Sequence, residues 1–554
     1  MVKNMKSDYQ ITRKYKQAID WSLYAIFIIN IGALYILFPP VHTLAILLWC
    51  YCFIFCLLIL YRPGWWLCGV VISICTLGFI PHLYGVFNAD VIDGSIVSVH
   101  MFRKLKKSGL QGRVISLALL GLSPSMIIWW LREKQVMIPK VFLPMAAFGL
   151  LMVSSSIIVC LAYVQLSVYP PFLSVVTPDF VHDLTITRNW WRAGMPYSLM
   201  AFTIILSFSN IIGLFLFAII YNILMKSYEN MKMITWAMVV STVITVAYGL
   251  MQVKGFVPAF SAAGRFESTF QSQGCYGIFV GISCVFFLSR LFLSKRYTLM
   301  NAALLLVSLG GLLINKSRTA FIAIVFSLFV VQAWDSLLRL KKEIFIVSGT
   351  RKALLVSLIS GLLICLFVLI IPQINHTIAR NLENQFIIRM VQTFDVDKGG
   401  VTYAFSDRIE IWGKSLDIWK KDPLWGCGYG QLYWELRKQK LGDTAANQFI
   451  LVLAELGIVG LALFLWVLAS LFRELVHPFS RAGGGKGYSE WLVWFCVVVS
   501  IIVQSLTVHI LHFPNLPMLI WVAFSVAIVC SRKCDDGVRV IAYKPAIDEC
   551  TEER

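Results

Sequence analysis

The sequence predicts an all-α fold, a polytopic membrane helix bundle of about 14 spans with one large extracytoplasmic loop. Hydrophobic residues make up 58% of the 554 residues and charged residues only 14%, with a mean hydropathy of +0.77. A water-soluble protein of this composition would expose large apolar patches. The apolar runs are roughly 18 to 25 residues long, as helical spans require, whereas strands of a membrane barrel would alternate over about ten residues.

The first apolar runs, near residues 20–38, 42–61 and 65–87, predict three closely connected spans. The N-terminus is polar and basic, and no small-residue cleavage site follows the first run, so we expect no cleavable signal peptide. Further spans are predicted near residues 114–131, 141–165, 198–224, 232–252, 273–292, 297–314, 319–338, 351–372, 447–472, 489–512 and 515–531.

The long polar interval before the last three spans is the main interruption of this pattern. We therefore divide the chain into N-terminal spans (1–197), central spans (198–372), a large periplasmic loop (373–446), C-terminal spans (447–531) and a tail (532–554). Long soluble segments held by a rigid scaffold are where binding and chemistry gather. The large loop and the spans beside it are thus the expected site. A transporter is disfavoured because no internal repeat is visible.

The charge pattern predicts the orientation. The net charge is +19, which we attribute to Lys and Arg in cytoplasmic loops rather than to nucleic-acid binding. Alternating spans back from the C-terminus places both termini in the cytoplasm and nearly all basic loops on that side. The basic segment 101–113 does not fit. Either it belongs to an interfacial or re-entrant helix, or the outer surface uses its cations.

Cysteine usage predicts neither a disulfide framework nor a metal site. Most of the 14 Cys lie in apolar runs, and Cys427 is the only one well inside the large loop. Cys530 and Cys534 lack the second ligand pair of a zinc site. We expect no metal and no cofactor.

Arginines lie close to membrane boundaries on the predicted outer side, where the positive-inside rule depletes them. They include Arg265, Arg318 and Arg408. A planar, permanently charged side chain suits phosphate or diphosphate oxygens, which points to an anionic lipid-linked substrate. The alternative is that each Arg extends to lipid headgroups or pairs with a loop carboxylate.

Four segments in order carry a family resemblance. They are GRFESTFQSQGCYGIFVG (264–281), NKSRTAFIAIVFSLFV (315–330), SDRIEIWGKSLDIWKKDPLWGCGYGQ (406–431) and NQFILVLAELGIVGLALF (447–464). Together they resemble the O-antigen ligases and O-antigen polymerases. No one of these motifs is specific, but their order and the placement of the large loop match that family.

The resemblance implies a glycosyltransferase of the bacterial inner membrane that takes a glycan from undecaprenyl diphosphate at the periplasmic face. The acceptor is lipid A-core in ligases, a second lipid-linked glycan in polymerases and a protein hydroxyl in related O-oligosaccharyltransferases. Such chemistry needs cations for the leaving diphosphate, a fixed donor and a proton acceptor.

On this resemblance we assign Arg265 and Arg318 to the diphosphate, Arg408 to positioning of donor or acceptor, and Asn447 to orientation of the acceptor. Lys316 beside Arg318 is a further substrate-binding candidate. Ligases of the family carry His before this Asn, where it is taken as the general base, but this chain has Ala446.

The resemblance therefore does not identify the general base. We take Asp443 as the candidate. Asp407 could also serve, but we expect it to cap the helix through Trp412. His509 and His512 are predicted to lie on one helix near the outer boundary, with or without a role. The missing His favours a polymerase in O-antigen or surface polysaccharide synthesis over a ligase, and leaves a non-catalytic binder of carrier-linked glycan as the alternative.

Several other residues have two readings. Trp412 could stack on a sugar or belong to the interfacial aromatic belt. Glu455, inside an apolar span, could bind substrate or pair with a neighbouring helix. Gly457 and Gly460 are expected at close helix contacts. Pro423, Gly426, Gly428 and Gly430 predict a tight turn that returns the loop to the membrane.

Overall fold

The structure is a computed structural model in which part of the chain can be described. That part comprises residues 42–76, 122–133, 136–168, 195–254, 256, 268–270, 273–293, 297–315, 317, 319–327, 329, 400–439, 447–476, 486–512 and 516–542.

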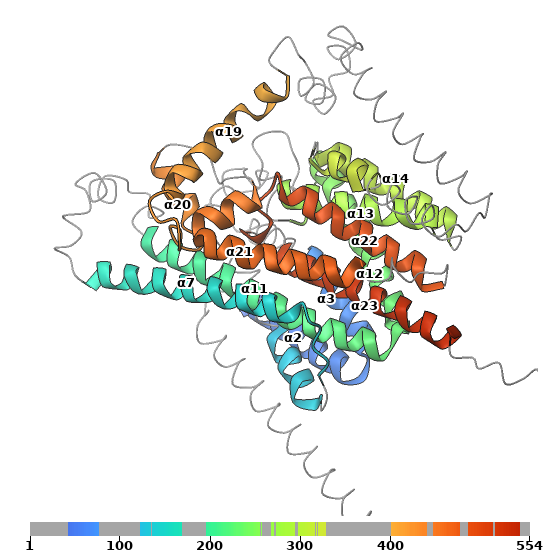
Figure 1. The fold of residues 1–554 in the computed structure, drawn as a ribbon. Helices are drawn as coiled ribbons and strands as arrows, with labels where there is room; N and C mark the ends of the chain where they lie inside the picture. The colour runs from blue at the N-terminus through green and yellow to red at the C-terminus, as the bar shows by residue number, and fades with distance from the viewer. Residues whose placement is uncertain are drawn as a thin grey trace, which may run out of the picture.

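The all-α membrane helix bundle predicted from the sequence is confirmed, because all regular secondary structure of the described residues is helical and they contain no strand (Figure 1). The number of about 14 spans stays a prediction. Within the described residues, eight helices are long and apolar enough to cross a membrane. The predicted spans near 20–38 and 351–372 lie outside the described residues. The helices are α2 (His42–Tyr61), α3 (Pro63–Thr76), α7 (Phe142–Val168), α11 (Met195–Lys226), η3 (Tyr228–Asn230), α12 (Met231–Val253), α13 (Gln273–Leu293), α14 (Thr298–Asn315), α19 (Gly400–Trp419), α20 (Leu432–Lys438), α21 (Gln448–Val476), α22 (Lys486–Ser505), η6 (Ile510–His512) and α23 (Leu516–Ala542).

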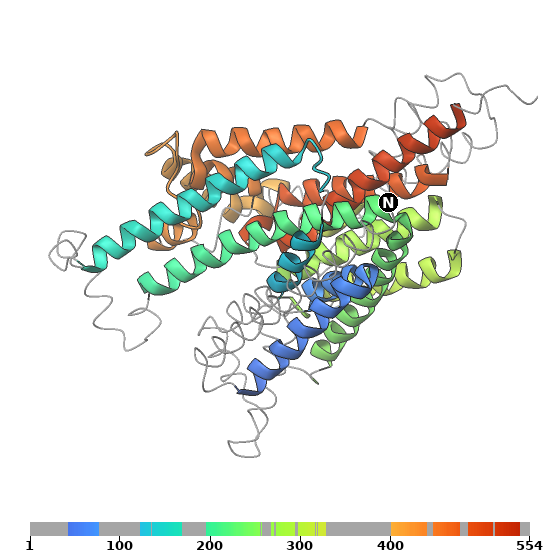
Figure 2. The same cartoon turned by 90° about the horizontal axis from the view of Figure 1, so that it is seen from below.

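The long helices pack side by side in a tilted bundle. Helix α11 lies between α7 and α23, and α21 lies along α7 (Figures 1 and 2). Helix α22 joins α23 to α13, which in turn packs on α14, and α12 lies against α3 and α14. Helix α19 and the short α20 lie at one end of the bundle, where α19 projects away from it (Figure 1).

Small residues set the closest helix contacts. A Cβ on Gly213 of α11 would lie 2.2 Å from the Trp521 ring of α23, and one on Gly149 of α7 would lie 2.5 Å from Leu214. Close approach matters here because lipid tails are as apolar as Leu, so helices associate in a membrane through packing rather than through the hydrophobic effect.

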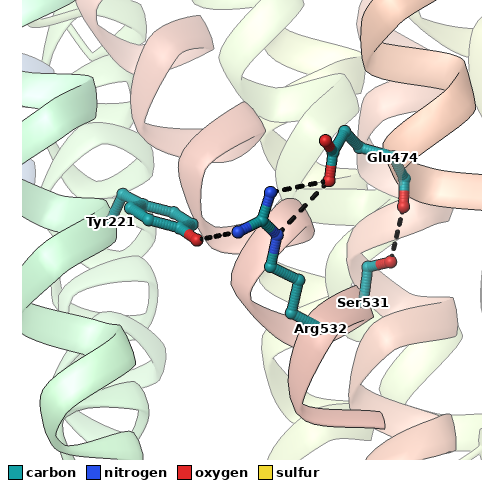
Figure 3. A network of polar contacts seen from close by, with 4 residues as sticks. All are labelled: Tyr221, Glu474, Ser531 and Arg532. Atoms are coloured by element: carbon teal, nitrogen blue, oxygen red, sulfur yellow. Dashed lines mark hydrogen bonds and ion pairs between the residues drawn. The ribbon is translucent and has the colours of Figure 1, made fainter. Parts of the chain in front are cut away.

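Charged side chains pair at the opposite end of the bundle from α19 and α20. Arg532 on α23 donates through Nε and Nη2 to Glu474 on α21, at 3.3 and 3.0 Å, and through Nη1 to the Tyr221 hydroxyl on α11 (Figure 3). Ser531 donates to the Glu474 carbonyl at 2.6 Å. This network ties three helices together.

A second ion pair lies at the same end. Arg290, near the end of α13, donates to Glu490 at the start of α22 at 3.0 Å, and to Thr235 at the start of α12 at 3.3 Å. These helix termini all belong to loops that the sequence assigns to the cytoplasmic side. The other end of the bundle therefore holds the starts of α13 and α21 and the end of α22, which belong to loops predicted to face outward.

Two local predictions are wrong. The span predicted at 489–512 ends as a helix at Ser505, and a turn and the 3₁₀ helix η6 follow, so His509 and His512 do not share an α-helix. Helix α19 begins at Gly400, so Asp407 lies inside it and is not its N-cap.

Candidate functional site

Helix α21 is broken at Gly457, which has φ 65° and ψ −165°. An unbroken helix would pair the N–H groups of Ile458 and Val459 with the carbonyls of Ala454 and Glu455. Here Ile458 donates to the Pro423 carbonyl at 2.9 Å and Val459 to that of Leu424 at 3.4 Å. The opened helix thus finds its partners in another part of the chain.

The same segment satisfies the carbonyls on the other side of the break. Cys427 donates its N–H to the Ala454 carbonyl and Gly428 to the Glu455 carbonyl, both at 2.9 Å. Residues 423–428, which we call the inserted segment, therefore complete the hydrogen bonding of α21. Irregular backbone at membrane depth is tolerated only where its polar groups are satisfied in this way.

Glycine is required where the two backbones meet. Gly426 and Gly428 have φ of 72° and 100°, as the turn predicted from the sequence needs. A Cβ on Gly457 would lie 2.1 Å from the Leu424 carbonyl oxygen, and one on Gly426 would lie 2.6 Å from that of Ala454. Gly457 thus contacts the inserted segment directly.

Glu455 lies beside the break with 1% of its surface exposed. Its Oε1 accepts the backbone N–H of Leu432, the first residue of α20, at 3.2 Å. Its carboxylate therefore faces the start of α20.

Tyr429 follows the inserted segment and fastens it to three further elements. Its N–H donates to Ser155 Oγ of α7 at 2.9 Å. Its hydroxyl accepts from Asn210 Nδ2 of α11 at 3.0 Å and donates to the Leu511 carbonyl of η6 at 3.3 Å. Burial, and to a lesser degree the Glu455 carboxylate, raise the pKa of Tyr429 well above its ordinary value of 10.0, against the opposing effect of the Asn210 bond. The hydroxyl therefore stays a donor at neutral pH.

Helices α19 and α20 pack on the first turns of α21 through a small apolar cluster of Ile418, Leu432, Leu436, Leu451 and Ala454. Trp412 and Trp419 cover it while partly buried, and Trp419 Nε1 donates to the Pro423 carbonyl at 3.0 Å. Trp412 is thus held against protein on one side.

The connection between α22 and α23 contacts both α19 and α21. Arg408 of α19 donates through Nη1 to the Thr507 carbonyl at 3.0 Å. Gln448, the first residue of α21, accepts the Leu511 N–H at 3.0 Å. Residues 506–512, the α22–α23 connection, therefore lie between Arg408 and the start of α21. The half-buried His509 lies between these two contacts in sequence.

Asn447 caps α21. Its Oδ1 accepts the N–H groups of Phe449 at 2.9 Å and Ile450 at 3.1 Å, which would otherwise lack partners at a helix start. This contact uses only the carbonyl oxygen of the amide and fixes the side chain beside the α22–α23 connection.

The remaining motif segments meet the same end of the bundle. A Cβ on Gly277, in the first turns of α13, would lie 2.6 Å from Asn315 Oδ1 and 2.8 Å from Ser317 Oγ. One turn further, a Cβ on Gly281 would lie 3.1 Å from both Ala320 Cβ and Gln504 Oε1. Gln504 is near the end of α22, so these segments approach the α22–α23 connection.

Residues 268–270, in the loop before α13, are anchored by two hydrogen bonds. Ser268, with φ 52°, donates its N–H to Gln252 Oε1 at 2.8 Å, and the Thr269 hydroxyl donates to the Cys75 carbonyl at 2.7 Å. The loop is thus tied to α12 and α3.

The structure places half of the predicted site residues. Arg408, Asn447, Trp412 and Glu455 surround the start of α21. The predicted residues Arg265, Lys316, Arg318 and Asp443 lie outside the described residues, although Ser317 between Lys316 and Arg318 contacts Gly277. Sequence reasoning passed over Tyr429, Gln448 and the α22–α23 connection. The polar Gln448 and the Tyr of the GYGQ turn were the available signals.

A family model described as O-antigen ligase matches residues 302–465. This part of the chain is similar to the O-antigen ligase family. The match begins in α14, covers the whole predicted large loop and ends in α21 beyond the Gly457 break, so it includes Arg408 and the four backbone hydrogen bonds between the inserted segment and α21. The resemblance inferred from the sequence is confirmed. No curated protein matches the chain.

The family match supports a coarse function. The O-antigen ligase-related family supports a multi-pass membrane protein with glycosyltransferase-like activity on lipid-linked glycans. Among the residues that the structure describes, no group of three or more His, Cys, Asp or Glu is arranged to hold a metal ion.

Proposed function

We propose that this O-antigen ligase-related chain transfers a glycan from undecaprenyl diphosphate at the periplasmic face of the bacterial inner membrane, in the polymerisation of O-antigen or another surface polysaccharide. The observation that carries the proposal is the convergence of family segments at one end of the bundle. The starts of α13 and α21, the turn at Ser317 and the Arg408 side of α19 all approach the α22–α23 connection.

Chemically, an acceptor hydroxyl oxygen attacks the anomeric carbon of the donor sugar. The bond from that carbon to the diphosphate oxygen breaks, its electron pair leaves with the diphosphate, and the hydroxyl proton goes to a base. Arg265 and Arg318 would stabilise the leaving diphosphate, with Lys316 beside them. Arg408 and Asn447 would position donor and acceptor, and Trp412 would face a sugar ring.

Arg408 supports this role through its surroundings. Its guanidinium donates to the Thr507 carbonyl at 3.0 Å, which orients the planar fork beside the α22–α23 connection. Because an Arg cannot be deprotonated in a protein, it keeps its charge beside the leaving group.

Asp443 remains our first candidate for the base. His509 is a second candidate, favoured by its position between the Arg408 and Gln448 contacts. The two are separable by the pH dependence of kcat for D443N and H509Q. Loss of the ascending limb near neutral pH in H509Q alone would assign the proton to His509, and the same loss in D443N alone would assign it to Asp443.

The proposal is tested with purified protein and undecaprenyl-diphosphate-linked repeat units, with and without lipid A-core, resolved by gel. A ladder of longer carrier-linked glycans without added acceptor is the expected result. Product only on lipid A-core would instead establish a ligase. Donor binding without product under either condition would overturn the proposed transferase activity and show that the protein only binds carrier-linked glycan.

A further inference from the structure

Glu455 has no part in the transfer chemistry set out above, yet it is a carboxylate buried in an apolar helix. Burying such a group is costly unless it makes specific contacts. Glu455 makes two such contacts. The Glu455 carbonyl oxygen accepts the Gly428 N–H at 2.9 Å, and its carboxylate accepts the Leu432 N–H at 3.2 Å. One residue therefore holds both ends of the stretch 428–432.

The helix that begins at Leu432 is important for the site. It opens α20, whose Leu432 and Leu436 pack on Leu451 and Ala454 of α21. The chain then returns to α21 at Asn447. Glu455, which contacts Leu432, and Asn447, where α21 begins, are about two helical turns apart on α21. In sequence, Leu432 precedes Asp443, the first candidate base, and Asn447, the proposed acceptor-orienting residue.

We propose that Glu455 is a positioning residue, whose carboxylate holds the start of α20 against α21 in the arrangement that transfer requires, without touching substrate. The proposal rests on the proposed function for its effect on rate, and on the structure alone for its effect on α20. It replaces direct substrate binding as the role of Glu455.

Two substitutions separate the acceptor oxygen from the charge. Glu455→Gln keeps an oxygen for the Leu432 N–H and removes the charge, whereas Glu455→Leu removes both. Hydrogen exchange is measured on the full-length protein in detergent. We expect amides of α20 to exchange about tenfold faster or more in Glu455→Leu, because the helix loses its first hydrogen bond, and about as in wild type in Glu455→Gln.

Transfer kinetics supply the second readout. We expect kcat to fall about tenfold or more in Glu455→Leu and to be rescued in Glu455→Gln, with KM for the lipid-linked donor little changed in both. The matched control is Glu474→Gln, the same substitution on the same helix at its other end, where the amide oxygen can still accept from Arg532. This control should keep wild-type kcat.

A second pair of variants approaches the contact from the other side. Leu432→Pro removes the N–H at the first position of α20, where Pro is tolerated. Leu432→Ala loses the side chain and keeps the N–H. If Glu455→Leu yields no folded protein, a lower kcat in Leu432→Pro than in Leu432→Ala supports the proposal, and equal kcat values overturn it.

The remaining outcomes are decisive. If kcat falls as much in Glu455→Gln as in Glu455→Leu, while hydrogen exchange in α20 stays as in wild type, the charge acts directly. That result would overturn the positioning role. Wild-type kcat in a folded Glu455→Leu would do the same. Wild-type protein that transfers no glycan would overturn the proposed function, while the exchange rates would still decide whether Glu455 holds α20.

Discussion

Ile458 donates its backbone N–H to the carbonyl of Pro423 at 2.9 Å, where a continuous α21 would pair it with Ala454. Two N–H groups and two carbonyls at the Gly457 break therefore keep hydrogen-bond partners, because the inserted segment supplies acceptors and donors for both sides. It follows that α21 and the end of the large loop form one structural unit. Neither can take its conformation without the other.

The first prediction concerns Gly457. Its φ of 65° with ψ of −165° belongs to a region that is essentially restricted to glycine, and a Cβ would lie 2.1 Å from the Leu424 carbonyl oxygen. We expect Gly457→Ala to lower the free energy of unfolding by about 3 kcal/mol or more, from backbone strain and displacement of the inserted segment. Thermal unfolding of the purified protein measures the effect.

Gly310 offers the matched control. It lies inside α14, and a Cβ there would meet nothing within 4 Å. Gly310→Ala should therefore leave Tm unchanged or raise it slightly, since Ala favours a helix over Gly by about 1 kcal/mol. Equal Tm values for Gly457→Ala and wild type would show that the break does not have this conformation.

The second prediction concerns Tyr429. Its hydroxyl bridges Asn210 Nδ2 and the Leu511 carbonyl, both at buried positions. Tyr429→Phe leaves these groups without that partner, so we expect a loss of about 1–3 kcal/mol in the free energy of unfolding, measured by thermal or denaturant unfolding. The control is Tyr61→Phe, at an exposed end of α2, which should have no effect.

The raised pKa of Tyr429 also predicts a pH dependence. Above the unfolded pKa of about 10, the unfolded chain loses this proton while the folded protein keeps it. Unfolding then releases a proton, so stability falls as pH rises above 10 and is fully present below it. Tyr429→Phe should show a shallower alkaline decline than wild type, and parallel declines would contradict the buried neutral hydroxyl.

The extent of most helices followed from composition. The spans predicted at 273–292 and 297–314 correspond to α13 at Gln273–Leu293 and α14 at Thr298–Asn315. Such agreement is expected because the membrane demands an apolar run of a certain length, and turn residues delimit each run. The glycine turn was predictable for the same local reason, since a positive φ favours Gly.

Features that depend on distant partners could not be predicted. Residues 506–512 are as apolar as the span before them, so hydropathy extended α22 to 512. The helix stops earlier, at Ser505, and Arg408, which is far away in sequence, donates a hydrogen bond to the Thr507 carbonyl just beyond its end. Likewise, nothing local to Gly457 shows that Pro423 and Leu424 replace its helical partners. Glu455 had two readings for the same reason, because its partner Leu432 belongs to the large loop.

The third prediction concerns the network of Figure 3, which lies at the other end of the bundle from the proposed site. Arg532→Met removes the partner of the mostly buried Glu474 carboxylate, whose side chain is 16% exposed. We expect the free energy of unfolding to fall by about 1–3 kcal/mol. Glycan transfer by the folded fraction should keep its kcat, and a large loss of kcat would mean that this end communicates with the site.

The last prediction concerns Arg318, which follows Ser317 at the close contact with Gly277. Packing at Gly277 holds the turn, so removing the Arg side chain should leave the fold intact. If its guanidinium stabilises the leaving diphosphate, Arg318→Ala should lower kcat by about 100-fold or more. Arg318→Lys should recover only part of this loss, because an ammonium cannot reproduce the planar two-point contact.

Arg132, which is exposed and donates to the Leu60 carbonyl at the opposite end, is the control, and Arg132→Ala should transfer glycan normally. Unchanged transfer by well-folded Arg318→Ala would remove Arg318 from the site, and the diphosphate would then have to be bound by Arg265 and Arg408.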